Sequence, residues 1–173
     1  MTNLDRKICL IGDYGVGKTS LIRRFIDRSF SDQYLTTVGV KISRKLVELN
    51  PSLKFQLIIW DVEGSTKFKA VSANYLQGAG GAIIVADLTR PETIENIPTH
   101  CEQFNRINPD RPIVIALNKC DLLLDKPPQI SNAYTTSAKS GEGVDMLFQN
   151  LCIKLAGHNL WMHCLRSYWL PVN

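Results

Sequence analysis

The chain has 173 residues, of which 45% are hydrophobic and 21% are charged. This composition is typical of one globular domain with a core of useful size, and it argues against a disordered chain, a collagen-like fibre or a small disulfide scaffold. The net charge of +4 is mild and selects no partner by itself. We expect no nucleic acid to bind.

We expect no targeting or membrane-spanning segment from the sequence. No apolar run approaches the roughly 18–20 residues that cross a bilayer, and residues 1–7 lack the apolar core of a secretion signal. The five cysteines are odd in number and show no C-x-x-C spacing, so we expect reduced thiols. These features predict a cytoplasmic protein.

Short apolar runs alternate with segments of helical periodicity. A buried strand is expected at residues 8–11, and a helix follows in which the apolar residues between 21 and 26 share one face. Residues 40–49 and 53–61 are predicted to form a hairpin. The basic residues of its first strand suit a sheet edge, where charge discourages pairing with other chains.

The second half of the chain continues this alternation. Strands are expected at 82–86, 113–117 and 133–136, and the first two have the continuous apolar pattern of buried parallel strands. Pro98 should kink or split the helix between them, and a final amphipathic helix from residue 144 should end at Gly157. The pattern predicts an α/β domain with a mostly parallel sheet, whose ligands bind at the carboxyl ends of the strands.

The strongest motif is Gly12-Asp13-Tyr14-Gly15-Val16-Gly17-Lys18-Thr19, which fits G-x-x-x-x-G-K-[ST] between a strand and a helix. Its glycines let the backbone N–H groups turn inward toward phosphate oxygens, and the start of the next helix adds to that positive field. Lys18 supplies a charge for the β- and γ-phosphates, and the Thr19 hydroxyl is suited to Mg²⁺.

Base recognition is indicated by Asn118-Lys119-Cys120-Asp121, directly after a predicted strand. The Asp121 carboxylate can accept hydrogen bonds from guanine N1–H and the exocyclic amine, whereas adenine would leave a buried Asp121 unpaired. Lys119 can lay its aliphatic stem over the base. Ser137-Ala138-Lys139 is a weaker signal, in which the Ala138 N–H could meet guanine O6.

A further set of residues points to the metal and the γ-phosphate. Asp61 ends a predicted strand and is placed to hold Mg²⁺ through water, and Gly64 offers a bare N–H to a γ-phosphate. Thr37 is a candidate for a second hydroxyl on the metal. The segment around Thr37 and the segment after Asp61 both contain glycine or serine, as mobile loops do.

Together these motifs resemble the Ras superfamily of small GTPases from about residue 7 to 156, most closely its Rab-like branch, with a bacterial relative of that branch as one alternative. The resemblance implies a P-loop NTPase fold: a six-stranded, mostly parallel sheet with one antiparallel edge strand and helices on both faces. It also implies GTP and GDP binding, Mg²⁺, and switch loops at 30–40 and 62–75 that meet effector and regulatory proteins.

The resemblance also assigns residue roles. Phe30 would pack edge-on against guanine, and Ser20 would donate its backbone N–H to the α-phosphate. The nucleotide contacts would be Tyr14, Gly15, Val16, Gly17, Lys18, Thr19, Ser20, Phe30, Thr37, Gly64, Asn118, Lys119, Asp121, Ser137, Ala138 and Lys139. The metal contacts would be Thr19, Thr37 and Asp61, and the catalytic set would be Lys18, Thr37, Gly64 and a degenerate Ser65.

The sequence departs from the family at three positions near the phosphates. Ser65 stands where the family has the glutamine that orients the attacking water, Glu63 replaces an alanine, and Tyr14 replaces a glycine or serine. Slow GTP hydrolysis is therefore expected. The alternative is a nucleotide-dependent binding module with little or no turnover, and an ATP-using P-loop enzyme is disfavoured by Asp121.

Two further departures concern organisation. Only 15 residues separate Asp121 from Ser137, so the helix before the last strand should be missing or reduced to a turn, which would uncover apolar sheet surface. The chain divides into a GTPase domain at 1–157 and an apolar tail at 158–173, which ends without a prenylation motif. This tail could pack on the domain, form a homodimer seam, or lie on a membrane or protein partner.

Overall fold

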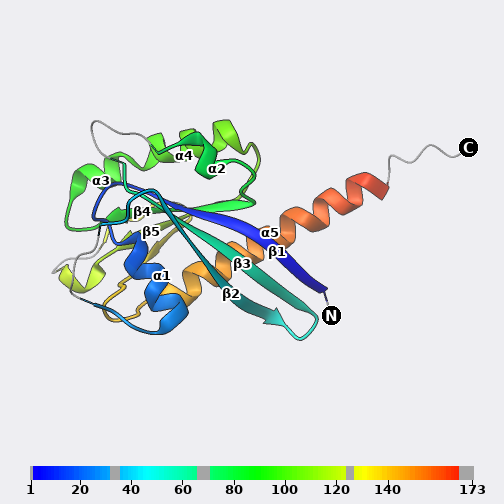
Figure 1. The fold of residues 1–173 in the computed structure, drawn as a ribbon, viewed down its shortest axis with the longest axis horizontal. Coiled ribbons are helices and arrows are strands. Elements are labelled where there is room, and N and C mark those ends of the chain that lie inside the picture. Colours follow the sequence, from blue (N-terminus) through cyan, green and yellow to red (C-terminus); the bar gives the residue numbers. More distant parts are fainter. Residues whose placement is uncertain (1, 32–35, 66–70, 124–126, 168–173) are drawn as a thin grey trace, which may run out of the picture.

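The computed structural model describes residues 2–31, 36–65, 71–123 and 127–167, and within these ranges the side chains of residues 4–157. Six strands form one sheet in the order β2-β3-β1-β4-β5-β6 (Figure 1). Their bounds are Thr2–Ile11 (β1), Val40–Asn50 (β2), Leu53–Val62 (β3), Gly81–Asp87 (β4), Ile113–Asn118 (β5) and Ala133–Thr135 (β6). The helices are Lys18–Asp27 (α1), Ala73–Leu76 (α2), Pro91–Glu95 (α3), Ile97–Ile107 (α4) and Val144–Ser167 (α5).

The sheet has the predicted directions. β3, β1, β4, β5 and β6 pair in parallel, and β2 is an antiparallel edge strand. All seven residues of β4 are buried, as its continuous apolar run requires. The predicted strands and the α/β class are therefore confirmed, and β1 extends further toward the N-terminus because residues 2–7 pair with β3.

Helices cover both faces of the sheet (Figure 1). On one face, α1 and α5 meet, and the rings of Phe25 and Phe148 stack with centroids 3.9 Å apart. On the other face, α2, α3 and α4 cover the strands, and Phe104 is completely buried there. The apolar layers on the two faces hold the central strands in place. The loops that follow the carboxyl ends of these strands therefore begin from fixed positions.

Pro98 splits the helix after β4, as predicted. α3 ends at Glu95 and α4 begins at Ile97, so Pro98 occupies the first turn of α4, where a missing backbone N–H costs nothing. The split places Asn96 at the junction of the two helices, close to the carboxyl end of β1.

The connection between β5 and β6 contains only a 3₁₀ turn, Cys120–Leu122, among its described residues, so the predicted loss of a full helix is confirmed; residues 124–126 lie outside them. The expected uncovering of the sheet is not seen. Leu123 and Ile130 pack onto this face, and Ile115 of β5 remains buried.

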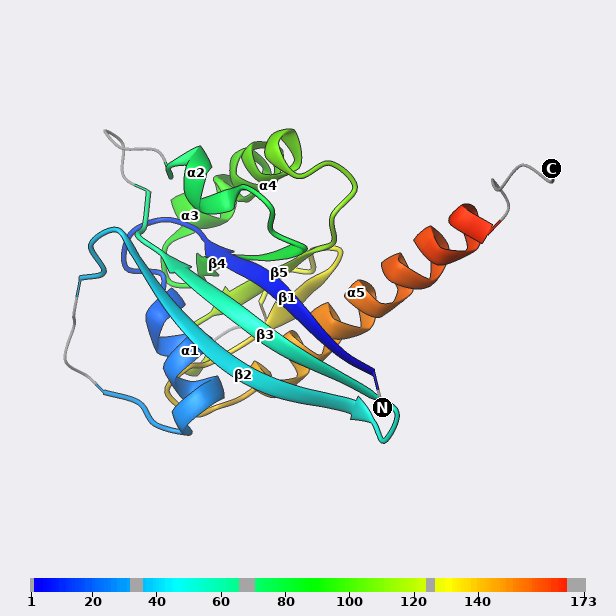
Figure 2. The same ribbon diagram turned by 45° about the vertical axis from the view of Figure 1, so that its right-hand side comes forward.

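The prediction that the last helix ends at Gly157 is wrong, because α5 continues to Ser167. A Cβ added at Gly157 would meet nothing, and a glycine without a competing turn costs a helix only about 1 kcal/mol. The final turns project beyond the sheet, past the N-terminal end of β1 (Figure 2). Among the described residues, no helix is long and apolar enough to span a bilayer.

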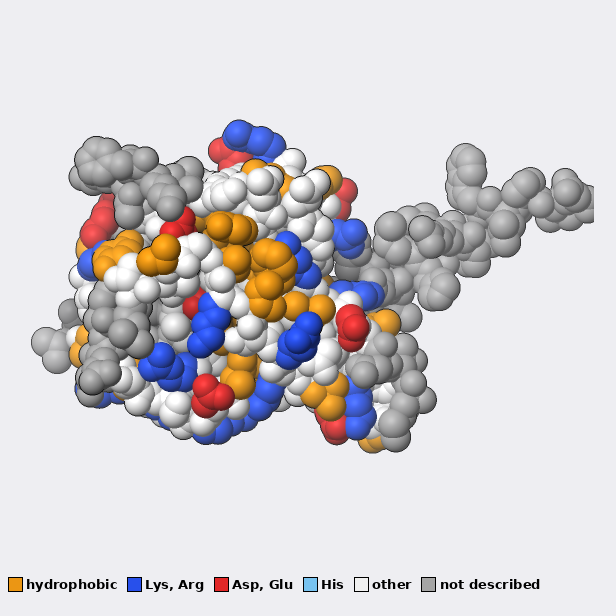
Figure 3. Space-filling model, viewed as in Figure 1, with side chains coloured by type: hydrophobic (Ala, Val, Ile, Leu, Met, Phe, Trp, Pro, Cys, Tyr) orange, Lys and Arg blue, Asp and Glu red, His pale blue; other side chains and the backbone are white. Residues whose placement is uncertain are grey.

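The edge strand β2 mixes apolar and basic side chains. Ile42 and Leu46 are exposed and alternate in the sequence with Lys41, Arg44 and Lys45. Figure 3 shows hydrophobic and basic side chains interspersed on this side of the molecule. The charges protect an unpaired edge, as the sequence predicts.

Candidate functional site

A cavity of about 400 Å³ opens at the carboxyl ends of the strands. Its walls come from the loop after β1, from α1, and from the segments that follow β3, β5 and β6. It is lined by Tyr14, Gly15, Gly17, Lys18, Thr19, Ser20, Arg23, Phe30, Ser31, Thr37, Val62, Gly64, Asn118, Lys119, Asp121, Leu122, Ala138 and Lys139. The separate sequence motifs therefore meet in one place, where a parallel sheet binds ligands.

The loop after β1 has the curled backbone that the glycine motif predicts. Gly17 has a φ of 99°, which is the left-handed region where glycine is preferred. Gly12 lies against β4, since a Cβ added there would come within 2.2 Å of the Val85 carbonyl oxygen. Both glycines are thus required by close approach or by backbone conformation.

Lys18 is buried at the base of this loop. Its ammonium donates hydrogen bonds to the carbonyl oxygens of Gly12, at 3.0 Å, and of Asp13, at 2.9 Å. Burial lowers the pKa of Lys18 to about 8, although the charges of Asp61 and Asp13 oppose the shift. A buried ammonium whose charge is only partly balanced by nearby carboxylates is suited to an anionic ligand at the cavity wall.

Three oxygen donors converge next to Lys18. The Thr19 hydroxyl donates to Asp61 Oδ2 at 2.6 Å and lies 2.8 Å from the Thr37 hydroxyl oxygen. Asp61 is buried, and its Oδ1 makes no hydrogen bond within the described part of the chain. Burial raises the pKa of Asp61 despite the hydrogen bond from Thr19. An orphaned carboxylate oxygen beside two hydroxyls fits a hard, oxygen-seeking cation such as Mg²⁺.

Asn118 ties the base-recognition segments to the phosphate loop. Its amide Nδ2 donates to the Val16 carbonyl oxygen at 2.9 Å. Its Oδ1 accepts from the Ala138 N–H at 3.2 Å and from the Thr136 hydroxyl at 3.3 Å. One buried side chain therefore joins three loops and fixes the position of the cavity wall.

The other two base-recognition residues are also held in place. Lys119 has a φ of 67°, and its ammonium lies 2.6 Å from Asp87 Oδ2. The Ser137 hydroxyl donates to Asp121 Oδ1 at 2.5 Å. Asp121 is exposed at the rim, whereas the sequence argument for guanine assumed a buried carboxylate. Selection of guanine by Asp121 therefore requires that the bound base itself shields this carboxylate from water.

Most of the predicted contact residues line the cavity, and two have different roles. Val16 packs its side chain in the core and offers its carbonyl oxygen to Asn118. Ser137 is fully buried behind Asp121. Phe30 and Ser20 lie on the wall, and their expected contacts with guanine and the α-phosphate stay predictions. Of the two predicted switch loops, residues 32–35 and 66–70 lie outside the described residues.

The three residues that depart from the family pattern all contact a neighbouring loop. Ser65 does not line the cavity, and its hydroxyl donates to Asp13 Oδ1 at 2.9 Å. Glu63 Oε2 accepts the Gly39 N–H at 3.0 Å. The Tyr14 hydroxyl lies 3.1 Å from the Thr36 hydroxyl oxygen. Each substitution thus joins two of the loops around the phosphate end of the cavity.

Sequence reasoning missed Asp87, which receives both Lys119 and the Arg90 guanidinium, the latter at 3.1 Å. Burial opposes ionisation of Asp87, but hydrogen bonds from Lys119 and Thr89 outweigh it and lower the pKa of the carboxyl. Its place at the carboxyl end of β4 was a usable signal. Arg23, Ser31, Val62 and Leu122 also line the cavity without having been predicted.

The fold and the cavity together define a P-loop nucleotide-binding domain. The family model described as "Ras of Complex, Roc, domain of DAPkinase" matches residues 7–121. Human Rab-22A is 37% identical over 118 residues, 68% of this chain and 60% of that protein. Dog Rab-13 is 35% identical over 158 residues, 84% of this chain and 77% of that protein. Rab-1C of Dictyostelium discoideum is 35% identical over 162 residues, 87% and 78% respectively. The chain belongs to the Ras superfamily and is a Rab-like small GTPase.

Proposed function

We propose that this protein is a guanine-nucleotide switch that binds GTP and GDP and hydrolyses GTP to GDP and phosphate. One observation carries the proposal: the buried Lys18 and the Asp121 carboxylate line a single cavity of about 400 Å³. The carboxylate of Asp61, with its orphaned oxygen, is hydrogen-bonded to Thr19 on the wall of that cavity. This combination supplies charge for a polyphosphate, a ligand for a cation and an acceptor for the guanine N–H groups. Family membership supports the same activity.

The residues divide the work between the two ends of the nucleotide. Lys18 and the backbone amides of the glycine loop hold the β- and γ-phosphates, and Asn118, Lys119, Asp121 and Ala138 hold the base. Thr19, Thr37 and Asp61 would hold Mg²⁺, which when bound would neutralise charge that develops on the phosphate oxygens. Water attacks the γ-phosphorus, the bond to the β–γ bridging oxygen breaks, and GDP leaves with that electron pair. The attacking water releases one proton to the solvent.

Slow intrinsic hydrolysis is part of the proposal. Ser65 is shorter than the glutamine that orients water in this family, and its hydroxyl is engaged by Asp13. Single-turnover hydrolysis of bound GTP by the purified full chain tests this directly. A rate equal to that of an ordinary Rab protein assayed in parallel would reject it.

A second candidate function is a binding module that holds nucleotide with little or no turnover. The contacts of Tyr14, Glu63 and Ser65 with neighbouring loops favour it, because they restrain the segments that must rearrange for hydrolysis. The nucleotide retained through purification separates the two functions. GTP is expected for the binding module, and GDP for the hydrolase.

Partners and location follow from the same proposal. Effector and regulatory proteins would meet the loops at 30–40 and 62–75. The protein would act in the cytoplasm, either free or at a membrane surface. The tail at 158–173 begins within α5, whose last turns stand clear of the sheet in the views shown, so a homodimer seam or a membrane or protein partner is favoured over packing on the domain. Light scattering and vesicle flotation of the full chain and of a chain ending at 157 separate these.

Calorimetry tests the central proposal. In magnesium buffer the protein should bind GDP and GTP, and the adenosine nucleotides should bind far more weakly. Lys18→Ala should abolish phosphate-dependent affinity, whereas Lys154→Ala, which changes an exposed contact of α5 with Asn132, should not. Equal affinity for guanosine and adenosine nucleotides would contradict the proposal.

A further inference from the structure

Gly64 is held between two fixed neighbours. The Glu63 N–H donates to the Gly39 carbonyl oxygen at 2.9 Å, and the Ser65 N–H donates to the Gly12 carbonyl oxygen at 3.2 Å. The Gly64 N–H itself makes no hydrogen bond within the described residues, and Gly64 lines the cavity. One free donor is therefore presented to the ligand while both flanking donors are occupied.

The segment around Gly64 pairs directly with the phosphate loop. Asp13 and Ser65 form a parallel β-bridge, in which the Tyr14 N–H returns a hydrogen bond to the Ser65 carbonyl oxygen at 3.0 Å. Contact is so close that a Cβ added at Gly64 would come within 2.5 Å of Tyr14 Cα. Glycine is thus required here by the approach of two backbones.

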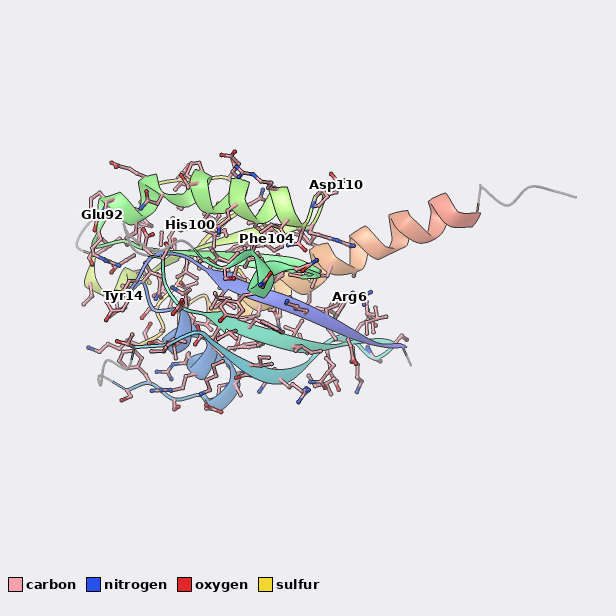
Figure 4. The ribbon with its side chains drawn as sticks, turned by 45° about the horizontal axis from the view of Figure 1, so that its top comes forward. Arg6, Tyr14, Glu92, His100, Phe104 and Asp110 are labelled. Carbon is pink, nitrogen blue, oxygen red and sulfur yellow. The ribbon has the colours of Figure 1, made fainter. Side chains whose placement is uncertain are left out.

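The Asp13 side chain, which does not line the cavity, stabilises the pairing between the phosphate loop and the segment after β3. Its Oδ1 accepts the Ser65 hydroxyl at 2.9 Å and lies 3.1 Å from His100 Nε2, and its Oδ2 accepts the Asn96 amide at 2.8 Å. Asn96 lies at the junction of α3 and α4, and His100 lies near the start of α4. Figure 4 places His100 and Tyr14 at the same end of the sheet. The carboxylate therefore links the phosphate loop, the segment after β3 and a helix.

We infer that Asp13 and Ser65 are positioning residues that hold the Gly64 N–H on the γ-phosphate site. The inference rests on the proposed function, because it assigns a γ-phosphate to this end of the cavity. Ser65 then has a defined role at the position of the missing glutamine: it fixes the loop and orients no water. Because only a triphosphate has a γ-phosphate, the Asp13–Ser65 contact should favour GTP over GDP.

Ser65→Ala tests the contact on the full chain, with Ser52→Ala, the same change at the exposed hairpin turn, as control. Hydrogen–deuterium exchange is measured first, on GDP-loaded or nucleotide-free protein. Ser65→Ala should speed exchange at the amides of Glu63 and Ser65, which donate hydrogen bonds to neighbouring loops, and Ser52→Ala should leave it unchanged. Unchanged exchange in Ser65→Ala would overturn the inference, whatever nucleotide the protein binds.

Affinities for GDP and for a non-hydrolysable GTP analogue give the second measurement. Ser65→Ala should weaken the analogue about tenfold, the value of one well-aligned hydrogen bond, and leave GDP affinity unchanged. Ser65→Thr, which keeps the hydroxyl, should bind the GTP analogue as tightly as the unaltered chain does. Equal weakening of both ligands would mean general damage and overturn the positioning role.

A double-mutant cycle with Asp13→Ala, which removes the acceptor of the Ser65 hydroxyl, completes the test. If the two residues act through their contact, adding Ser65→Ala to Asp13→Ala should cost no further analogue affinity. Additive losses would overturn this. Failure of the unaltered chain to bind any guanine nucleotide would refute the proposed function and the Gly64 role together. The exchange experiment would still decide whether the Asp13–Ser65 contact exists.

Discussion

The side chain of Asn118 lies directly against Gly17, so that a Cβ added to Gly17 would come within 2.3 Å of Asn118 Nδ2. That amide donates to Val16, one residue before Gly17 in the phosphate loop. The base-recognition segment and the phosphate loop are therefore in contact even without a ligand, and the fit depends on the absence of one methyl group.

Gly17→Ala should therefore displace Asn118 and strain a backbone with a φ of 99°. We expect a loss of stability of about 1–3 kcal/mol, measured by urea unfolding, and a marked loss of GDP affinity. Gly157→Ala is the matched control, since its added Cβ meets nothing inside α5; it should stabilise the protein by about 0.5–1 kcal/mol. Equal effects of the two substitutions would contradict the packing argument.

Asn118→Ala should destabilise the protein even without nucleotide. It removes the partner of the Val16 carbonyl oxygen and of the Ala138 N–H, and each buried group left unpaired costs about 1–3 kcal/mol. Urea unfolding of nucleotide-free protein measures this effect, which separates scaffolding from base contact. Asn105→Ala, on an exposed position of α4, should change stability little. An unaltered unfolding midpoint for Asn118→Ala would show that the three loops are held by other contacts.

The sequence predicted the strands, the edge strand and the split at Pro98, because each depends on local periodicity or on proline geometry. The sequence also predicted that Lys18, Thr19, Asn118 and Asp121 lie close together. The reason is that the carboxyl ends of parallel strands meet at the same edge of the sheet. The Asp13 contacts with Asn96 and His100 were not predictable in this way. They join residues more than 80 positions apart, and no spacing rule relates them. The end of α5 was missed because a single glycine is a weak stop signal.

Lys18 predicts an alkaline pH dependence of stability in the nucleotide-free protein. Burial lowers its pKa from 10.5 to about 8, so the unfolded chain holds this proton more tightly than the folded one. The unfavourable contribution is complete below pH 8 and disappears as the pH rises to 10.5, a gain of about 3 kcal/mol. The difference in unfolding free energy between the unaltered chain and Lys18→Met should therefore rise over this window. A difference that stays constant from pH 7 to 10.5 would show that Lys18 is neutral or fully compensated in the fold.

Asp87 predicts the opposite, acidic dependence. Its pKa lies below the usual 3.8, since hydrogen bonds from Lys119 and Thr89 outweigh the effect of burial. The stability contributed by the carboxylate is therefore present above pH 4 and is lost as the pH falls through the lowered value. Asp87→Asn should weaken the protein near neutral pH and should match the unaltered chain more closely at pH 3, as measured by urea unfolding. Asp145→Asn is the matched control, because Asp145 pairs with Arg28 on the exposed surface, where an ion pair contributes about 0–1 kcal/mol. An equal loss of unfolding free energy in Asp145→Asn and Asp87→Asn would contradict this prediction. It would mean that the buried ion pairs of Asp87 with Lys119 and Arg90 contribute no more than an exposed pair.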